Sequence, residues 1–177
     1  TGAGSLLLRE TSATWINLHD LLHPLGDSNE LCPGGFIWGS ERTGFRHLYL
    51  YGRDGRLVRH LTDGEWMVDT LAGVDAGRSL GYFTGTQPDV RGRHLYRVAL
   101  GGGMPEQVTE GEGIHLVKLD HGQNRFVDVF ESASEPPRVT LASLHGEGEP
   151  AVIYRTDDPR IAELSLQPPE FVSITNR

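Results

Sequence analysis

Short runs of apolar residues that alternate with polar ones recur along most of this chain, and glycine-rich turns separate them. The runs are rich in Val, Tyr, Phe and Leu, and the turns include the strings RDG, DAG, GGG and DHG. Such a pattern is typical of short β-strands joined by tight turns. No stretch shows the sustained periodicity of a long helix. We therefore predict an all-β fold.

The predicted strands fall into three groups. The first reads GFIWGSE, HLYLYG and LVRHLT, and a less regular segment around residues 15–25 precedes it. The second reads VDTLAGV, SLGYFTG, HLYRVAL and EQVT, and the third reads IHLVKL, RFVDVF, RVTLAS and AVIYRT. Four short strands in each ~40–50 residues are the signature of a propeller blade.

An internal repeat with a period of 47 residues links the groups. RHLYLYGRDGRLVRHLTDGE at residues 46–65 aligns without a gap to RHLYRVALGGGMPEQVTEGE at residues 93–112. The repeat pairs Leu48 and Tyr49 with Leu95 and Tyr96, and we expect each pair on equivalent strands with Leu and Tyr on opposite faces. The other matched residues are Arg46 with Arg93, His47 with His94, Thr62 with Thr109, Gly64 with Gly111, Glu65 with Glu112, and Phe83 with Phe130.

These observations predict a partial β-propeller of about three four-stranded antiparallel blades over residues 30–156. Residues 1–29 are then an irregular remnant of a preceding blade, and residues 157–177 are a linker. Trp15, Trp38 and Trp66 lie in or beside predicted strands, where aromatic side chains pack between blade sheets. We expect Trp66 to open the innermost strand of a blade and to be buried.

Gly77-Arg78-Ser79-Leu80-Gly81 spells G-x-S-x-G, the string that carries the nucleophile in many serine hydrolases. That site requires a strand before the serine and a helix directly after it. Here DAGR is a turn and another predicted strand follows. We therefore interpret Ser79 as a residue at the start of a strand and not as a nucleophile.

The string HDLLH at residues 19–23 resembles a metalloprotease motif, with Asp20 in place of the glutamate. The metal chemistry requires both histidines on one helical face. Pro24 would end such a helix at once, so we expect a loop with solvent-facing histidines and no metal site. His47 and His94, being repeated, are expected to serve the scaffold through a hydrogen bond to a neighbouring strand or loop. The GGG string at 101–103 lacks a following helix and is interpreted as a hairpin turn, not a phosphate loop.

Composition narrows the function classes further. The net charge is −8, and the 16 basic residues are scattered and include a single lysine, Lys118, so no surface for nucleic acid or an anionic membrane is indicated. No apolar run is long enough for a membrane span and no signal peptide is visible. The single cysteine, Cys32, excludes an internal disulfide and leaves the compartment open. No cofactor is predicted.

Nearly the whole chain, residues 13–176, resembles the N-terminal propeller of the dipeptidyl peptidase IV family and its bacterial relatives. The resemblance is carried by WINLHDLLHPL, by PPRVTLASL and, most specifically, by the block SERTGFRHLYLYGRDGRLVRHLTDGEWMVD. The tail DPRIAELSLQPPEFVSIT resembles the stretch that joins this propeller to an α/β-hydrolase domain, which would begin at about Phe171.

The resemblance implies an eight-bladed propeller that caps a serine hydrolase. Such an enzyme removes dipeptides with Pro or Ala in second position from peptide N-termini. The propeller restricts access, and its glutamates hold the substrate's α-ammonium group. The catalytic serine, aspartate and histidine would all belong to the hydrolase domain. The family's adjacent glutamate pair has no counterpart here, and its substrate-contacting arginine would fall near Asp20–Leu22, where no arginine stands. No catalytic or substrate-binding residue is therefore transferred.

Three functions remain open. The first is the last blades of a dipeptidyl peptidase propeller, with a hydrolase domain and the remaining blades as partners and peptide as the parent's substrate. The second is a TolB-like propeller module for protein–protein interaction. The third is a self-contained hydrolase that uses Ser79 or a metal at His19 and His23. Because incomplete propellers leave sheet faces uncovered, we also expect copies of the chain to associate.

Overall fold

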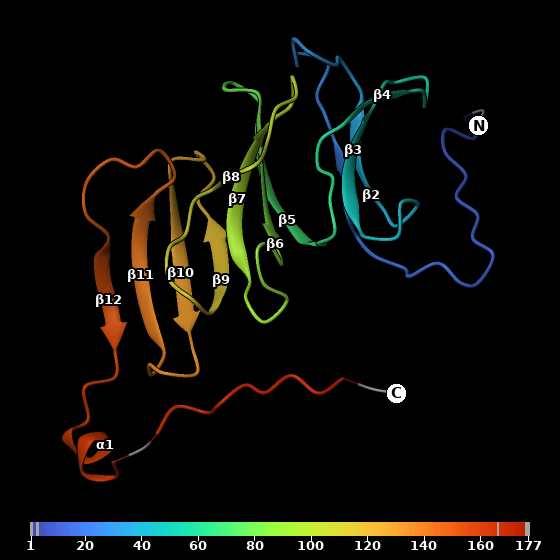
Figure 1. Cartoon of the computed structure of the whole chain (residues 1–177). Helices are drawn as coiled ribbons and strands as arrows, with labels where there is room; N and C mark the ends of the chain where they lie inside the picture. The colour runs from blue at the N-terminus through green and yellow to red at the C-terminus, as the bar shows by residue number, and fades with distance from the viewer. Residues whose placement is uncertain (1, 3, 166, 176–177) are drawn as a thin grey trace. The chain divides into compact units, whose positions relative to one another are not determined.

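The computed structural model describes residues 2, 4–165 and 167–175. The described residues form three four-stranded antiparallel sheets and one five-residue helix (Figure 1). In every sheet each strand pairs with the next one along the chain. The predicted all-β class and the three four-stranded blades are confirmed.

The strand bounds follow the predicted groups closely. The first sheet contains β1 (Leu22–Pro24), β2 (Phe36–Ser40), β3 (His47–Tyr51) and β4 (Leu57–His60). The second contains β5 (Val68–Asp75), β6 (Leu80–Gly85), β7 (His94–Ala99) and β8 (Glu106–Gln107). The third contains β9 (Ile114–Leu119), β10 (Arg125–Glu131), β11 (Arg138–Ser143) and β12 (Ala151–Arg155), and the helix α1 spans Pro159–Glu163.

Two segments differ from the expected division. β1 lies inside residues 1–29, so the first sheet draws a strand from the segment that we interpreted as a remnant of a preceding blade. The chain separates into two compact units, residues 1–110 with the first two sheets and residues 111–177 with the third. Within the predicted linker α1 forms one helical turn, and residues 167–175 adopt neither helix nor strand.

The first two sheets share one hydrophobic core. Leu48 and Leu50 of β3 lie in the same buried cluster as Phe83 of β6 and Tyr96 of β7. Tyr49 belongs to a separate cluster on the opposite face of the first sheet. An aliphatic face of the first sheet therefore packs on an aromatic face of the second, as stacked blades require.

The sequence repeat has a structural counterpart in this core. Leu48 and Leu95 lie on β3 and β7, the third strands of their sheets, and both are fully buried. The amide of Leu48 donates to the Thr62 hydroxyl over 2.9 Å, and the amide of Leu95 donates to Thr109 over 3.0 Å. In each sheet the threonine hydroxyl thus provides a hydrogen-bond acceptor just beyond the end of the fourth strand. The predicted equivalence of the two copies of the 47-residue repeat is confirmed.

Trp66 is the side chain that joins the two sheets. Its ring stacks on Phe83 and Tyr96 with centroids 5.9 and 6.1 Å apart, and it meets His47 edge-on at 5.2 Å. It is 9% exposed and lies two residues before β5. The predicted burial is confirmed, but Trp66 precedes β5 rather than opening this strand. For Trp15 the prediction is wrong: it lies outside any strand and is 75% exposed, because no second sheet reaches it within the described unit.

Candidate functional site

Ser79 lies at the end of the tight turn that joins β5 to β6. Its φ is 54°, and β6 begins at Leu80, so a strand and not a helix follows it. The Ser79 carbonyl accepts a hydrogen bond from the Leu100 amide over 2.8 Å, which ties the turn to the end of β7. Without a following helix, this site lacks the backbone donors that stabilise an oxyanion at a nucleophile elbow. Ser79 is thus the last residue of the turn, one position before the strand that we expected it to begin, and its surroundings are not those of a nucleophile elbow.

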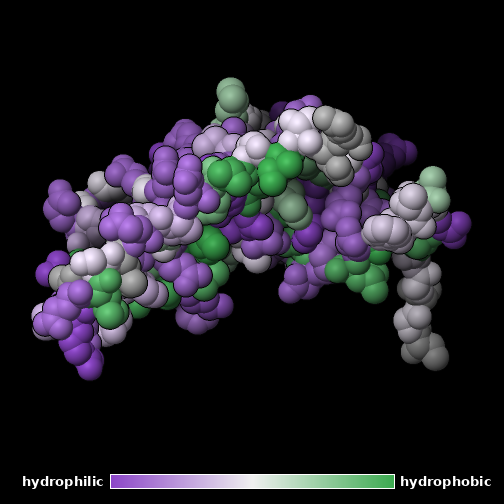
Figure 2. Space-filling view, turned by 60° about the horizontal axis from the view of Figure 1, so that its bottom comes forward, coloured by the Kyte–Doolittle hydropathy of each residue, from purple (hydrophilic) through white to green (hydrophobic). Residues whose placement is uncertain are grey.

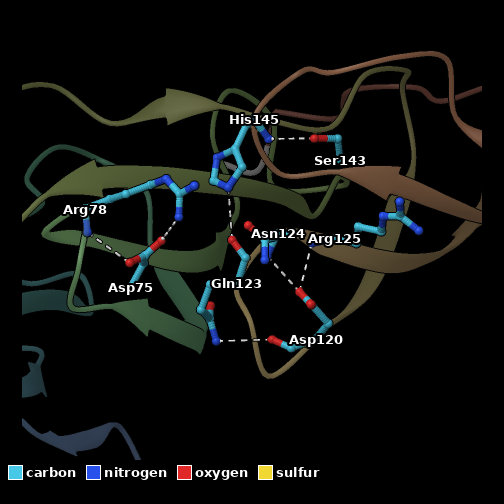
Figure 3. A network of polar contacts seen from close by, with 8 residues as sticks. All are labelled: Asp75, Arg78, Asp120, Gln123, Asn124, Arg125, Ser143 and His145. Carbon is cyan, nitrogen blue, oxygen red and sulfur yellow. Dashed lines mark hydrogen bonds and ion pairs between the residues drawn. The ribbon is translucent and has the colours of Figure 1, made fainter.

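Asp75 organises this turn (Figure 3). Its carboxylate accepts from the Arg78 amide and from the Arg78 guanidinium, each over 2.9 Å. Burial of the carboxyl disfavours its charge, but these hydrogen bonds outweigh burial and hold the pKa of Asp75 below its ordinary value. The polar groups beside Ser79 therefore serve the turn, because the Asp75 carboxylate is already engaged by Arg78.

The turn that joins β9 to β10 in the third sheet is also stabilised by an aspartate carboxylate (Figure 3). The Asp120 carboxylate accepts from the amides of Asn124 and Arg125, each over 2.8 Å, and these bonds lower the pKa of Asp120. The His145 ring bonds the Gln123 carbonyl over 3.1 Å. The Leu144 amide donates to Asn124, as Leu100 does to Ser79. The G-x-S-x-G string therefore lies in a turn that an aspartate carboxylate stabilises, and the third sheet has a turn of the same kind.

The HDLLH string does not form the helix that the metalloprotease motif requires. His19 lies outside the strands, with its ring 4.9 Å from that of Trp38, whereas His23 lies within β1. His23 is half-buried rather than solvent-facing, and burial lowers its pKa. The expected loop is wrong at residues 22–24, because Leu22, His23 and Pro24 pair with β2. The described residues include no group of three or more His, Cys, Asp or Glu placed to hold a metal ion.

His47 and His94 have scaffold contacts, as expected. The Nε2 of His47 lies 3.0 Å from the Gly64 carbonyl, and its Nδ1 lies 3.0 Å from the Thr62 hydroxyl. Because a carbonyl can only accept, Nε2 donates to it. The Gln107 amide nitrogen approaches His94 Nδ1 over 3.2 Å and also donates to the Thr109 carbonyl. Both rings therefore fasten the third strand of a sheet to the end of its fourth.

A buried His–Asp pair escaped the sequence interpretation. His115 Nδ1 lies 2.8 Å from Asp128 Oδ2 in the third sheet, and both side chains are buried. The signal was present in RFVDVF, where Asp128 occupies an inward position between Phe126 and Phe130. A His–Asp pair is one part of a serine triad. In this structure the pair joins β9 to β10 within the third sheet.

A groove with a volume of about 760 Å³ lies in the first unit. It lies between residues 8–19 and the loop that follows β2. Glu10 bridges the two sides, because its Oε1 accepts from the Ser40 hydroxyl and from the Arg42 guanidinium, the latter over 2.8 Å. Arg42 also lies over the Tyr49 ring, 4.5 Å from its centroid. The groove is lined by both polar and apolar side chains, which include Ser40, His19 and Trp15.

Three meandering four-stranded sheets, two of them related by a 47-residue repeat and packed face to face, define these elements as blades of a β-propeller. Among the described residues no helix is long and apolar enough to cross a membrane.

Residues 1–137 match the family described as the dipeptidyl peptidase IV (DPP IV) N-terminal region, and the chain belongs to this family. The chain is 29% identical over 167 residues to dipeptidyl peptidase 8 of Homo sapiens, covering 78% of this chain and 18% of the relative. It is 32% identical over 128 residues to probable dipeptidyl-aminopeptidase B of Aspergillus fumigatus, covering 70% of this chain and 14% of the relative. The crystal structure of Porphyromonas gingivalis dipeptidyl peptidase 4 matches with a TM-score of 0.66 and 25% identity, covering 73% of this chain and 18% of that chain.

The chain therefore spans less than a fifth of the length of each of these relatives. This short coverage is consistent with a hydrolase domain that lies outside the chain. The predicted family and the partial propeller are confirmed.

Proposed function

We propose that this chain is a non-catalytic part of the propeller of a dipeptidyl peptidase IV-like serine peptidase. The parent would remove N-terminal dipeptides with Pro or Ala in second position. The propeller would restrict access to a separate hydrolase domain and help to position the peptide. The observation that carries the proposal is the combination of the family match with a G-x-S-x-G serine that lies in an ordinary blade turn.

The residues themselves support a scaffold role. Ser79, His47 and His94 are each engaged in contacts within a blade, and Ser79 is followed by β6 rather than by a helix. Activated serines need a general base within hydrogen-bond reach. We therefore assign the chemistry to the domain that the resemblance places after about Phe171.

Turnover of Gly-Pro and Ala-Pro chromogenic substrates tests this proposal. We expect no hydrolysis by the 177-residue chain, no labelling by a fluorophosphonate probe, and no change in either result for Ser79→Ala. The protein expressed from the complete reading frame should hydrolyse both substrates and take the probe. Turnover by the chain that depends on Ser79 would overturn the assignment. A complete protein that neither turns over nor takes the probe would favour the TolB-like interaction module.

We also propose that copies of the chain associate when they are isolated from further blades. The support is the number of large apolar side chains that remain exposed, which include Leu6, Leu18, Leu116 and Tyr154. On the face drawn in Figure 2, apolar residues gather in a few separate groups among polar ones. Repeat units bury such surface only against neighbours. Sedimentation over a range of concentrations tests this association.

A further inference from the structure

Residues 6–15 resemble the segment that connects the first two sheets, residues 57–66. The two segments share three residues at the same spacing: Leu6 with Leu57, Thr11 with Thr62, and Trp15 with Trp66. The segment 57–66 contains β4, which is the outer strand of the first sheet, and most of the turn that leads to β5. By this alignment residues 6–9 correspond to β4.

The structure places the two segments against equivalent turns. Gly55 and Gly102 are equivalent in the 47-residue repeat, and both have a positive φ, of 77° and 99°. A Cβ at Gly102 would meet the Arg59 guanidinium at 2.7 Å, and a Cβ at Gly55 would meet the Leu7 carbonyl oxygen more closely still. A residue of β4 thus lies against this turn of the second sheet, and a residue of the segment 6–9 lies against the same turn of the first sheet.

A leucine that follows in each segment packs on the aromatic residues of the next sheet. Leu61 shares the buried core with Phe83 and Tyr96. Leu8 packs on the cluster that contains the repeat counterparts of these two rings, Phe36 and Tyr49. Residues 6–9 therefore lie on the first sheet as the outer strand of the first sheet lies on the second.

Thr11 and Trp15 differ from their counterparts in burial. The Thr62 hydroxyl accepts a hydrogen bond from the Leu48 amide of β3 over 2.9 Å, and Trp66 is buried between the first two sheets. Thr11 and Trp15 are both exposed. Among the described residues no strand pairs with residues 6–9, so a strand in the position of β3 is what this segment lacks.

We infer that residues 6–15 are the docking surface for the third strand of a further blade of the parent protein. Residues 6–9 pair with that strand, and the Thr11 hydroxyl accepts a hydrogen bond from one of its amides. Trp15 is buried between that blade and the first sheet. The partner is a third strand because its amide needs an acceptor where the outer strand ends, which is what Thr62 provides to β3. The inference rests on the proposed propeller parent and names the residues that attach another of its blades.

Hydroxyl-radical footprinting with mass spectrometry tests the burial of Trp15. The 177-residue chain is compared with the protein expressed from the complete reading frame, and Trp66 is the internal reference. In the chain Trp15 should be oxidised about eightfold faster than Trp66, in proportion to their exposed fractions of 75% and 9%. In the complete protein the two rates should agree within about twofold, because both rings are then packed between blades. A Trp15 that stays several-fold more reactive than Trp66 in the complete protein would overturn the inference.

Thr11→Val tests the acceptor, and Thr14→Val is the matched control, since Thr14 is exposed in the same segment and its hydroxyl contacts that of Ser12. In the complete protein Thr11→Val should raise the oxidation rate of Trp15 about fivefold, as the loss of one hydrogen bond in the contact implies. Thr14→Val should leave that rate unchanged.

The same substitutions in the 177-residue chain complete the test. Thr62→Val should lower the urea midpoint of the chain, whereas Thr11→Val should leave it unchanged, because the partner strand is not part of the chain. Equal oxidation of Trp15 in Thr11→Val and Thr14→Val of the complete protein would overturn the role of Thr11. These outcomes do not depend on peptidase activity, so the substrate and probe assays above judge the proposed function separately.

Discussion

Replacing Trp66 by alanine should destabilise the first unit more than any substitution of an exposed aromatic residue. Trp66 is 9% exposed and contacts Phe83, Tyr96 and His47 through its ring. Removal of a large aromatic side chain from a core costs about 3–5 kcal/mol, and each aromatic pair contributes about 0.5–1.5 kcal/mol of such a total. Because three ring contacts disappear together, we expect a loss of at least about 3 kcal/mol.

Urea unfolding followed by far-ultraviolet circular dichroism measures this loss, since the signal does not depend on the tryptophan removed. The denaturation midpoint should fall with little change in slope. Trp15→Ala is the matched control, because Trp15 is 75% exposed and its removal should change stability by less than about 0.5 kcal/mol. Protein concentration is held low and equal, so that association does not contribute. A loss below about 1 kcal/mol for Trp66→Ala would refute the idea that this ring joins the two sheets.

Two further substitutions test the turns and the third sheet. The folded-state pKa of Asp75 lies below its unfolded value of about 3.9. Asp75 therefore stabilises the fold above that value and loses this contribution as pH falls through the folded-state pKa. Asp75→Asn should accordingly lower the thermal midpoint at pH 7, and the difference from wild type should shrink below pH 4; a constant difference would contradict this account. In Gly113→Ala the new Cβ would lie 2.4 Å from the Glu131 carbonyl oxygen, so we expect a loss of about 1–3 kcal/mol in urea unfolding. Gly77→Ala, whose Cβ would meet only the Asp75 carboxylate at 3.5 Å, should change stability far less, and equal effects of the two would refute the steric argument.

The strand pattern could be predicted from the sequence because each blade is built from local signals. Alternating residues and glycine turns define β5 to β12 almost residue by residue. β1 lies within the segment around residues 15–25 that the sequence marks only as less regular, because this strand has three residues, ends in Pro24 and is ordered by pairing with β2 rather than by its own pattern. Long-range pairing of this kind leaves no periodic trace in the chain.

The candidate sites were predictable only in part, for a similar reason. Ser79 could be judged from its flanking turn and strand, which are local. The Glu10–Arg42 contact joins residues that are 32 positions apart, and the His115–Asp128 pair depends on the register of β9 and β10. Charged residues at such separations are too common in a sequence for their pairing to be inferred. Only the register and the fold bring them together.

The repeat places adjacent Leu and Tyr residues on opposite sides of the third strand in each of the first two sheets. Leu48 and Tyr49 are adjacent and so face opposite ways, and the same holds for Leu95 and Tyr96. In the first sheet the side of Leu48 packs on the second sheet, and the side of Tyr49 carries a separate aromatic cluster. In the second sheet the side of Leu95 also carries Tyr82 and Arg97. On the aromatic side of the first sheet, Arg42 lies over the Tyr49 ring and Leu8 packs on the aromatic cluster, so a cation–π contact and an apolar contact both contribute to burial of these rings.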